Sequence, residues 1–128
     1  MQLMKNERDF KGCYMRDEIL PNRGCYCLNL DDKSDPGTHW VAVYGDEYYD
    51  SYGLPPPKKL SHLKYNTVQH QKPNSSLCGL YACFYIYSRN RNKSAYDICY
   101  KIFKINGNEK ELKNFHNELL YTSNNRNT

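Results

Sequence analysis

The sequence lacks three features that would indicate a membrane, a secreted or a dedicated nucleic-acid-binding protein. No apolar run reaches the length of about 20 residues that a membrane-spanning helix needs. Residues 1–10 mix polar and charged side chains, which does not fit a signal peptide. The net charge is only +4, so weak association with nucleic acid is allowed, but the strongly basic surface of a dedicated binder is absent. We therefore expect a protein that is neither membrane-bound nor secreted.

Cysteine pairs at metal-binding spacing are also missing. Cys25 and Cys27 would face the same side of a strand, with Cys13 upstream, but their spacing is not the two-residue gap of zinc sites and no paired Cys or His follows. In a reducing compartment, an even number of cysteines does not imply disulfides. We expect free thiols, with Cys83 and Cys99 in the core, and neither a metal nor another cofactor.

What the chain does have is the length and composition of one globular domain. It has 128 residues, of which 39% are hydrophobic and 25% charged. No internal repeat or change of composition marks a second domain, so residues 1–128 are expected to form a single domain and a monomer. Residues 1–9 and 122–128 are polar and are predicted to be flexible. The 13 tyrosines predict a core and cleft rich in aromatic rings with polar tips.

Hydrophobic patterning and turn residues place strands in the first half of the chain and helices in the second, an order typical of an α+β fold. The strand at 39–44 has strong β character and should be central, and a turn at 45–47 pairs it with the next strand as a hairpin. Strands are expected at 10–15, 25–30, 39–44, 48–50 and 65–69, and helices at 57–63, 78–90, 94–104 and from 108 onward, with Ser94 and Asn108 as N-caps.

Cys78 stands where a polar loop at 71–77 ends and an apolar helix begins. The unpaired N–H groups and the dipole at a helix N-terminus favour an anion, so a thiol there has a lowered pKa and is a candidate nucleophile. Gly79, directly after it, would let the backbone of a bound substrate approach closely. The alternative is that Cys78 is a small buried residue of the helix, as most free cysteines are.

His39 and Asp50 lie at the two ends of the predicted hairpin that meet side by side. A histidine is the usual base at neutral pH, and a carboxylate fixes its tautomer and stabilises its charged form. His39 could instead be satisfied by a backbone carbonyl, and Asp50 could cap the turn that follows it. Trp40 is a candidate for the floor of a substrate cleft or for the core. The remaining histidines have no such context and are expected at the surface: His62, His70 and His116.

Gln71 completes the set of groups that acyl transfer through a thioester requires. Its side-chain N–H could stabilise an oxyanion together with the backbone N–H of Cys78. Gln69 is a competitor for this role, although it falls in the predicted strand. The four candidate catalytic residues occur along the chain in the order His39, Asp50, Gln71 and Cys78.

Three segments together resemble the adenain group, the adenovirus maturation proteases and their relatives in virophages and virus-like DNA transposons. They are Gly-Thr-His-Trp at 37–40, Tyr-Asp-Ser-Tyr-Gly at 49–53 and Gln-Lys-Pro-Asn-Ser-Ser-Leu-Cys-Gly at 71–79. The same order of residues occurs in the SUMO-deconjugating proteases, which share the fold. Leu77 stands where those enzymes usually carry Asp, whereas Asp50 is more like them, because adenain has Glu there. The resemblance runs from about residue 10 through the helix after Cys78.

The resemblance implies a papain-like cysteine protease fold in the permuted adenain arrangement, with a small antiparallel or mixed sheet packed on the helix that bears Cys78. It implies that His39 is the base, Asp50 its orienting group, Cys78 the nucleophile and Gln71 the oxyanion donor. The expected substrates are capsid or core precursor proteins cleaved after small residues such as Gly, in the virion or in the cytoplasm or nucleus of an infected cell.

Two alternatives to a maturation protease stay open, an isopeptidase that acts on ubiquitin-like proteins and a non-catalytic binding module with a protease fold. The chain is short for the group, which predicts a reduced C-terminal portion. No residues match those through which adenain uses DNA or a peptide cofactor.

Overall fold

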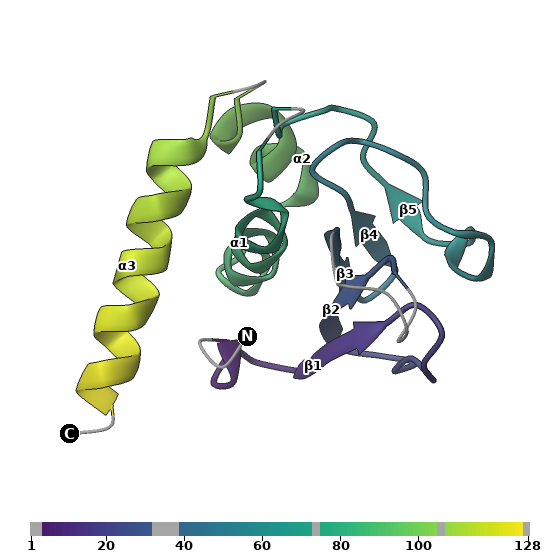
Figure 1. Cartoon of the computed structure of the whole chain (residues 1–128), viewed down its shortest axis with the longest axis horizontal. Helices are drawn as coiled ribbons and strands as arrows, with labels where there is room; N and C mark the ends of the chain where they lie inside the picture. The colour runs from purple at the N-terminus through teal and green to yellow at the C-terminus, as the bar shows by residue number, and fades with distance from the viewer. Residues whose placement is uncertain (1–3, 32–38, 73–74, 105–106, 127–128) are drawn as a thin grey trace.

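A five-stranded mixed sheet forms one side of the molecule in the computed structural model, which describes residues 4–31, 39–72, 75–104 and 107–126, with side chains up to 120. The strands lie in sequence order across the sheet (Figure 1). The β2–β3 and β3–β4 pairs are antiparallel, and the two outer pairs are parallel. The bounds are β1 Phe10–Met15, β2 Cys25–Asn29, β3 Trp40–Tyr44, β4 Glu47–Tyr49 and β5 Lys64–Tyr65.

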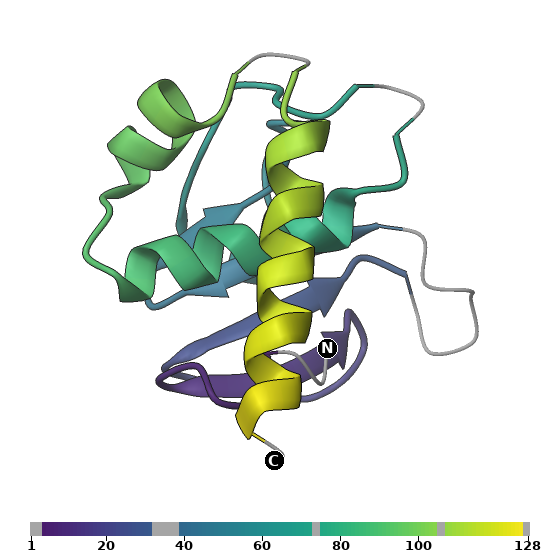
Figure 2. The same ribbon diagram turned by 90° about the vertical axis from the view of Figure 1, so that its left-hand side faces the viewer.

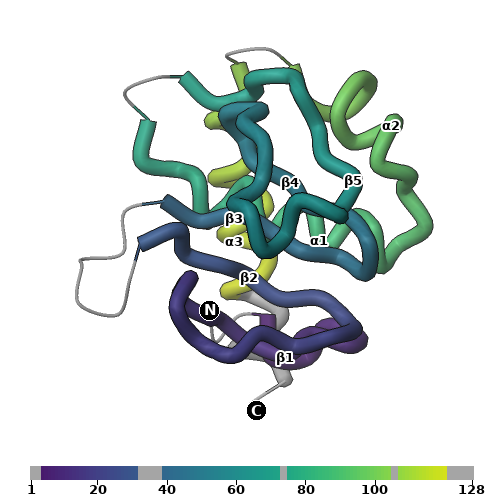
Figure 3. Tube along the Cα trace, turned by 90° about the vertical axis from the view of Figure 1, so that its right-hand side faces the viewer, coloured from purple at the N-terminus to yellow at the C-terminus, as the bar shows by residue number. Residues whose placement is uncertain are grey.

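Two helices stack on one face of this sheet. Helix α1 (Cys78–Asn90) lies between the sheet and the long helix α3 (Glu109–Arg126), as Figure 1 shows. Figure 2 shows α3 crossing over α1, and Figure 3 shows the strands from the opposite side with the helices behind them. The short helix α2 (Ala95–Asp97) continues into a π-helical turn, η3 (Ile98–Ile102). The predicted α+β fold with a mixed sheet on the cysteine-bearing helix is confirmed.

Side-chain alternation along the strands builds two cores. On the α1 side, Cys25, Cys27, Ala42 and Tyr49 pack with apolar residues of all three helical segments. On the other side, a second cluster includes Leu60 and Leu63, contributed by the segment around the 3-10 turn η2 (Lys58–Leu60). Because both faces are covered, β2 is buried at every position.

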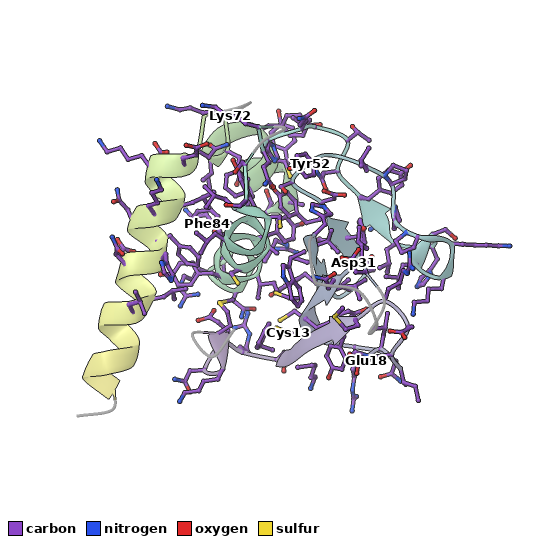
Figure 4. The ribbon with its side chains drawn as sticks, in the orientation of Figure 1. Cys13, Glu18, Asp31, Tyr52, Lys72 and Phe84 are labelled. Carbon is purple, nitrogen blue, oxygen red and sulfur yellow. The ribbon has the colours of Figure 1, made fainter. Side chains whose placement is uncertain are left out.

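Aromatic and ionic contacts fix the layers to one another. Phe84 of α1, labelled in Figure 4, lies on the side of α1 that faces α3. Its ring packs edge-to-face against that of Phe115 of α3, with the ring centroids 5.1 Å apart. Between sheet and helix, the guanidinium of Arg89 donates two hydrogen bonds to the Glu47 carboxylate at 2.9 and 3.0 Å, and the Tyr85 hydroxyl donates a third at 2.6 Å. This cluster connects β4 to α1. The candidate site lies where β4 ends and where α1 begins.

Several element boundaries differ from the sequence prediction. The strand expected at 65–69 ends at Tyr65, and the helix expected at 57–63 is only the turn Lys58–Leu60, with Pro57 preceding it. Ser94 caps α2 as predicted, its side chain accepting the N–H of Asp97 at 3.0 Å, but the helical segment ends at Ile102.

The two ends of the described chain also differ from the prediction. Met4, in a segment expected to be flexible, is fully buried in the core. Helix α3 continues to Arg126, whereas the sequence predicted a flexible tail from residue 122. Asn108 does not use its side chain to cap α3. Its Oδ1 accepts the N–H of Lys104 at 2.7 Å, and its Nδ2 donates to the hydroxyl of Tyr81 at 3.2 Å.

Candidate active site

The ends of β3 and β4 bring His39 and Asp50 together, as the hairpin predicted. His39 directly precedes β3 and Asp50 directly follows β4, and His39 Nε2 lies 3.0 Å from Asp50 Oδ1. Asp50 is buried, while the His39 side chain keeps 18% of its exposure. Asp50 Oδ1 also accepts the backbone N–H of Tyr52 at 2.8 Å, so Asp50 supports the turn as well as contacting His39.

Asn66 holds the backbone of Asp50 from both sides, and the sequence analysis missed it. Its Oδ1 accepts the N–H of Asp50 at 3.0 Å, and its Nδ2 donates to the carbonyl of Asp50 at 2.7 Å. The predicted strand at 65–69 includes Asn66, although Asn is depleted in strands. That depletion is the signal that could have marked it as a residue with another task.

Cys78 is the first residue of α1, and its sulfur lies close to the first residue of β3. The backbone N–H of Trp40 donates to Cys78 Sγ at 3.4 Å. His39 is hydrogen-bonded to the same thiol. Because His39 Nε2 faces Asp50, Nδ1 is the ring nitrogen left to face the sulfur. The structure therefore brings together His39, Asp50 and Cys78, of which the first and the last are 39 positions apart in the sequence.

The electrostatics favour a charged pair between Cys78 and His39. Burial pushes the pKa of Cys78 upward, but the hydrogen bond to His39, the N–H of Trp40, the charge of His39 and the N–H of Gly79 together lower that pKa below its ordinary value. Burial pulls the pKa of His39 down, but its bonds to Asp50 and Cys78 and their negative charges raise the pKa to about 9. This arrangement can hold a thiolate beside an imidazolium near neutral pH.

Gln71 is buried in the loop before α1, with an exposed fraction of 1%. Its Nε2 donates to the carbonyl of Ser75 at 2.8 Å, and its Oε1 accepts the hydroxyl of Ser51 at 2.5 Å. The competitor Gln69 is exposed and donates its side-chain N–H to the backbone carbonyl of Gln71 at 3.0 Å. Gln71 is thus the buried amide of this loop and Gln69 the exposed one.

His70 was predicted to lie at the surface, and this prediction is wrong. Its side chain is fully buried, with Nδ1 2.9 Å from the Tyr49 hydroxyl and Nε2 2.8 Å from the carbonyl of Cys99. Burial lowers the pKa of His70, so the neutral ring accepts from Tyr49 and donates to Cys99. The surrounding polar residues in the sequence gave no signal of this burial, which depends on contacts with β4 and η3.

The two residues predicted to bind substrate flank the sulfur. Trp40 is half-buried and packs against the α1-side core, in addition to its N–H contact with Cys78. Gly79 supplies a backbone N–H to the same thiol. A third neighbour, Tyr52, was missed by the sequence analysis. Its ring centroid lies 5.0 Å from that of His39, and its hydroxyl donates to the carbonyl of Ser75 at 3.5 Å (Figure 4 labels Tyr52).

The described ranges contain no group of three or more His, Cys, Asp or Glu side chains placed to hold a metal ion. The six cysteines are free thiols, and Cys83 and Cys99 are buried in the core as predicted. Among the helices that the structure describes, none is long and apolar enough to cross a membrane.

Comparison with known proteins finds viral cysteine proteases. The chain is 33% identical over 97 residues to cysteine protease S273R of African swine fever virus, with 56% of this chain and 35% of the relative covered. It is 32% identical over 97 residues to a protein of another isolate of that virus named SUMO-1 cysteine protease S273R, with the same coverage. The chain thus spans about a third of the length of the curated relatives it matches. No family model matches the chain.

A solved structure supports the same assignment of the fold. The crystal structure of the African swine fever virus pS273R protease superposes with a TM-score of 0.51 at 26% identity, covering 75% of this chain and 42% of that chain. Together with the curated relatives, it confirms the predicted resemblance to adenain-like cysteine peptidases, which share the SUMO-deconjugating protease fold.

Proposed function

We propose that the chain is a cysteine peptidase domain that hydrolyses peptide bonds through a thioester on Cys78. The observation that carries the proposal is the contact of one histidine with both a buried carboxylate and a thiol at a helix N-terminus. His39 lies 3.0 Å from Asp50 and is hydrogen-bonded to Cys78, whose pKa is lowered. The similarity to viral proteins named as cysteine proteases supports the same chemistry.

In the first half of the reaction, the Cys78 thiolate attacks the carbonyl carbon of the scissile bond, and the carbonyl electrons move onto the oxygen. As this tetrahedral intermediate collapses, the C–N bond breaks, and the His39 imidazolium gives its proton to the departing amine. The product is a thioester on Cys78 and a neutral imidazole. Asp50 holds the ring in place and stabilises its charged form.

In the second half, neutral His39 takes a proton from water, and the resulting hydroxide attacks the thioester. Collapse of this second intermediate releases the acid and returns the Cys78 thiolate beside the imidazolium. In both intermediates, the oxyanion is stabilised by the side-chain N–H of Gln71 and the backbone N–H of Cys78. Cys78 is the first residue of α1, where the backbone N–H groups lie at the positive end of the helix dipole.

The substrates we propose are viral capsid or core precursor proteins, cleaved after small residues such as Gly. The support is the resemblance of the segments at 37–40, 49–53 and 71–79 to maturation proteases, together with the viral origin of the relatives. An isopeptidase acting on a ubiquitin-like protein is the second candidate. Two observations favour it, the name SUMO-1 cysteine protease given to a relative and the presence of Asp50 where adenain has Glu.

The test is cleavage of Gly-containing precursor peptides and of ubiquitin-like C-terminal reporters by the purified chain. Cys78→Ala should abolish turnover, and Cys13→Ala, which removes an exposed thiol from β1, should leave it unchanged. Cleavage of the precursor peptides alone supports the maturation protease, whereas cleavage of the reporters alone supports the isopeptidase. Equal turnover by the unmodified chain and by Cys78→Ala would exclude the thioester mechanism.

A further inference from the structure

Three consecutive residues, beginning with the last residue of β4, each contact a different side chain in or beside the site. The Tyr49 hydroxyl contacts His70 Nδ1 at 2.9 Å, Asp50 Oδ1 contacts His39 Nε2 at 3.0 Å, and the Ser51 hydroxyl contacts Gln71 Oε1 at 2.5 Å. Tyr49 and Ser51 therefore both act on the loop that carries the proposed oxyanion donor. Ser51 takes no part in the proposed bond-making steps, although its side chain is buried and contacts that donor.

Ser51 fixes this loop through its backbone as well. Its carbonyl accepts two consecutive N–H groups, from His70 at 2.8 Å and from Gln71 at 3.1 Å. The backbone of Gln71 is therefore placed by main-chain contacts that do not depend on the serine side chain. The hydroxyl of Ser51 adds a contact that reaches only the side-chain amide of Gln71.

The orientation of that amide follows from what each neighbour can donate or accept. The carbonyl of Ser75 can only accept, so the atom 2.8 Å from it must be Nε2 of Gln71. The other end of the amide is then Oε1, which can only accept, so the Ser51 hydroxyl must donate to it. In the described part of the chain, the contact with Ser75 uses a single hydrogen of Nε2, and the second hydrogen of that nitrogen can donate to an oxyanion.

We propose that Ser51 is a positioning residue, whose hydroxyl holds the Gln71 amide with its N–H end available to the oxyanion. The inference rests on the proposed function, in which Gln71 is the oxyanion donor. An oxyanion donor is effective because it is oriented before charge develops. A rotated amide would present Oε1, a lone-pair acceptor, to the negative oxygen. The hydroxyl therefore acts on the transition state and not on the binding of substrate.

The test compares Ser51→Ala with the unmodified chain in steady-state cleavage of the peptide that the unmodified chain turns over. We expect kcat to fall about tenfold with KM unchanged, less than the 100- to 1,000-fold loss typical of removing an oxyanion donor itself. Ser51→Cys, which keeps a weaker donor in a similar volume, should recover part of this loss. Ser88→Ala removes another buried serine hydroxyl, on α1, and should leave kcat unchanged.

A double-mutant cycle separates positioning from a general structural role. In a Gln71→Ala background, Ser51→Ala should cause no further loss of kcat, because its target is gone. Alkylation of Cys78 by iodoacetamide involves no oxyanion, so Ser51→Ala should not slow it. An unchanged kcat in Ser51→Ala, or the same tenfold loss in the Gln71→Ala background, would overturn the inference while the peptidase stands.

Failure of the proposed function would look different. It would appear as cleavage by Cys78→Ala, or as no cleavage by the unmodified chain, whatever residue stands at position 51. Affinity for a peptide aldehyde, which forms a tetrahedral adduct with the thiol, gives a readout that needs no turnover. Ser51→Ala should weaken this affinity about tenfold, and equal affinity of the two proteins would overturn the inference.

Discussion

Replacing Asp50 with Asn removes a charge from the site while keeping most of its geometry. Oδ1 of Asp50 accepts from the Tyr52 N–H and contacts His39, and an Asn oxygen can make both contacts. Oδ2 is buried and has no hydrogen-bond partner in the described part of the chain, so the new NH2 group would be placed there. The variant therefore tests the charge of Asp50 more than its position.

The magnitude follows from the pKa of His39. With Asp50 in place this pKa is raised to about 9 from an ordinary value of 6.5, and the bond to Asp50 is the largest influence that raises it. At pH 7.5, a group with a pKa of about 9 is about 97% protonated, whereas a group with a pKa of about 6.5 is only about 9% protonated. If the pKa returns to its ordinary value, the population of imidazolium falls about tenfold, and kcat/KM falls at least as much.

The assay is the pH dependence of kcat/KM for the two proteins between pH 5 and 10. Activity of the unmodified chain should fall as the pH rises through about 9, because His39 then loses the proton that it gives to the leaving amine. In Asp50→Asn, this alkaline limb should move toward about pH 6.5. An alkaline limb that stays in place in Asp50→Asn would refute the assignment of Asp50 as the group that charges His39.

Three further substitutions test residues that stabilise the site or the fold around it. Asn66→Ala removes both side-chain bonds to the Asp50 backbone, so kcat should fall and the free energy of unfolding should drop by about 1–3 kcal/mol in urea; an unchanged kcat would contradict this role. Glu47→Gln should lower the free energy of unfolding by about 1–3 kcal/mol, because the Glu47 carboxylate accepts three hydrogen bonds and its side chain is only 18% exposed. The control is Asp46→Asn, which should cost less than about 0.5 kcal/mol, because Asp46 is 69% exposed and its ion-pair partner Lys64 is 80% exposed. Burial lowers the pKa of His70, so below about pH 6.5 the unfolded chain binds a proton that the folded ring does not, and the free energy of unfolding should decrease as the pH is lowered. In urea titrations, His70→Gln should make this decrease smaller.

Local signals in the sequence were enough to predict the main parts of the fold and of the site. The β-rich run 40–44, the turn after it and the apolar helix after Cys78 each depend on neighbouring residues, so their patterns are visible along the chain. Once the hairpin is predicted, the meeting of His39 and Asp50 follows from its geometry, and the structure shows it.

The missed residues depend on contacts that no local pattern reveals. Asn66 bonds to a residue 16 positions away, and His70 contacts partners 21 and 29 positions away. His70 stands between Gln69 and Gln71, where exposure is the ordinary expectation for a polar residue. Ser51 lies in one of the three segments that carry the resemblance, but its side chain contacts Gln71, which is 20 positions away in the sequence. Such supporting residues become visible only when the tertiary structure is known.

The rate of Cys78 alkylation by iodoacetamide, followed by peptide mass mapping, shows directly whether His39 activates the thiol. At pH 6 to 7, Cys78 should be labelled faster than the exposed Cys13, although it is buried, because His39 and the N–H groups around it stabilise the thiolate. His39→Ala should abolish this advantage and leave the labelling of Cys13 unchanged. Preferential labelling of Cys13 in the unmodified chain, or a rate at Cys78 that does not depend on His39, would contradict the account.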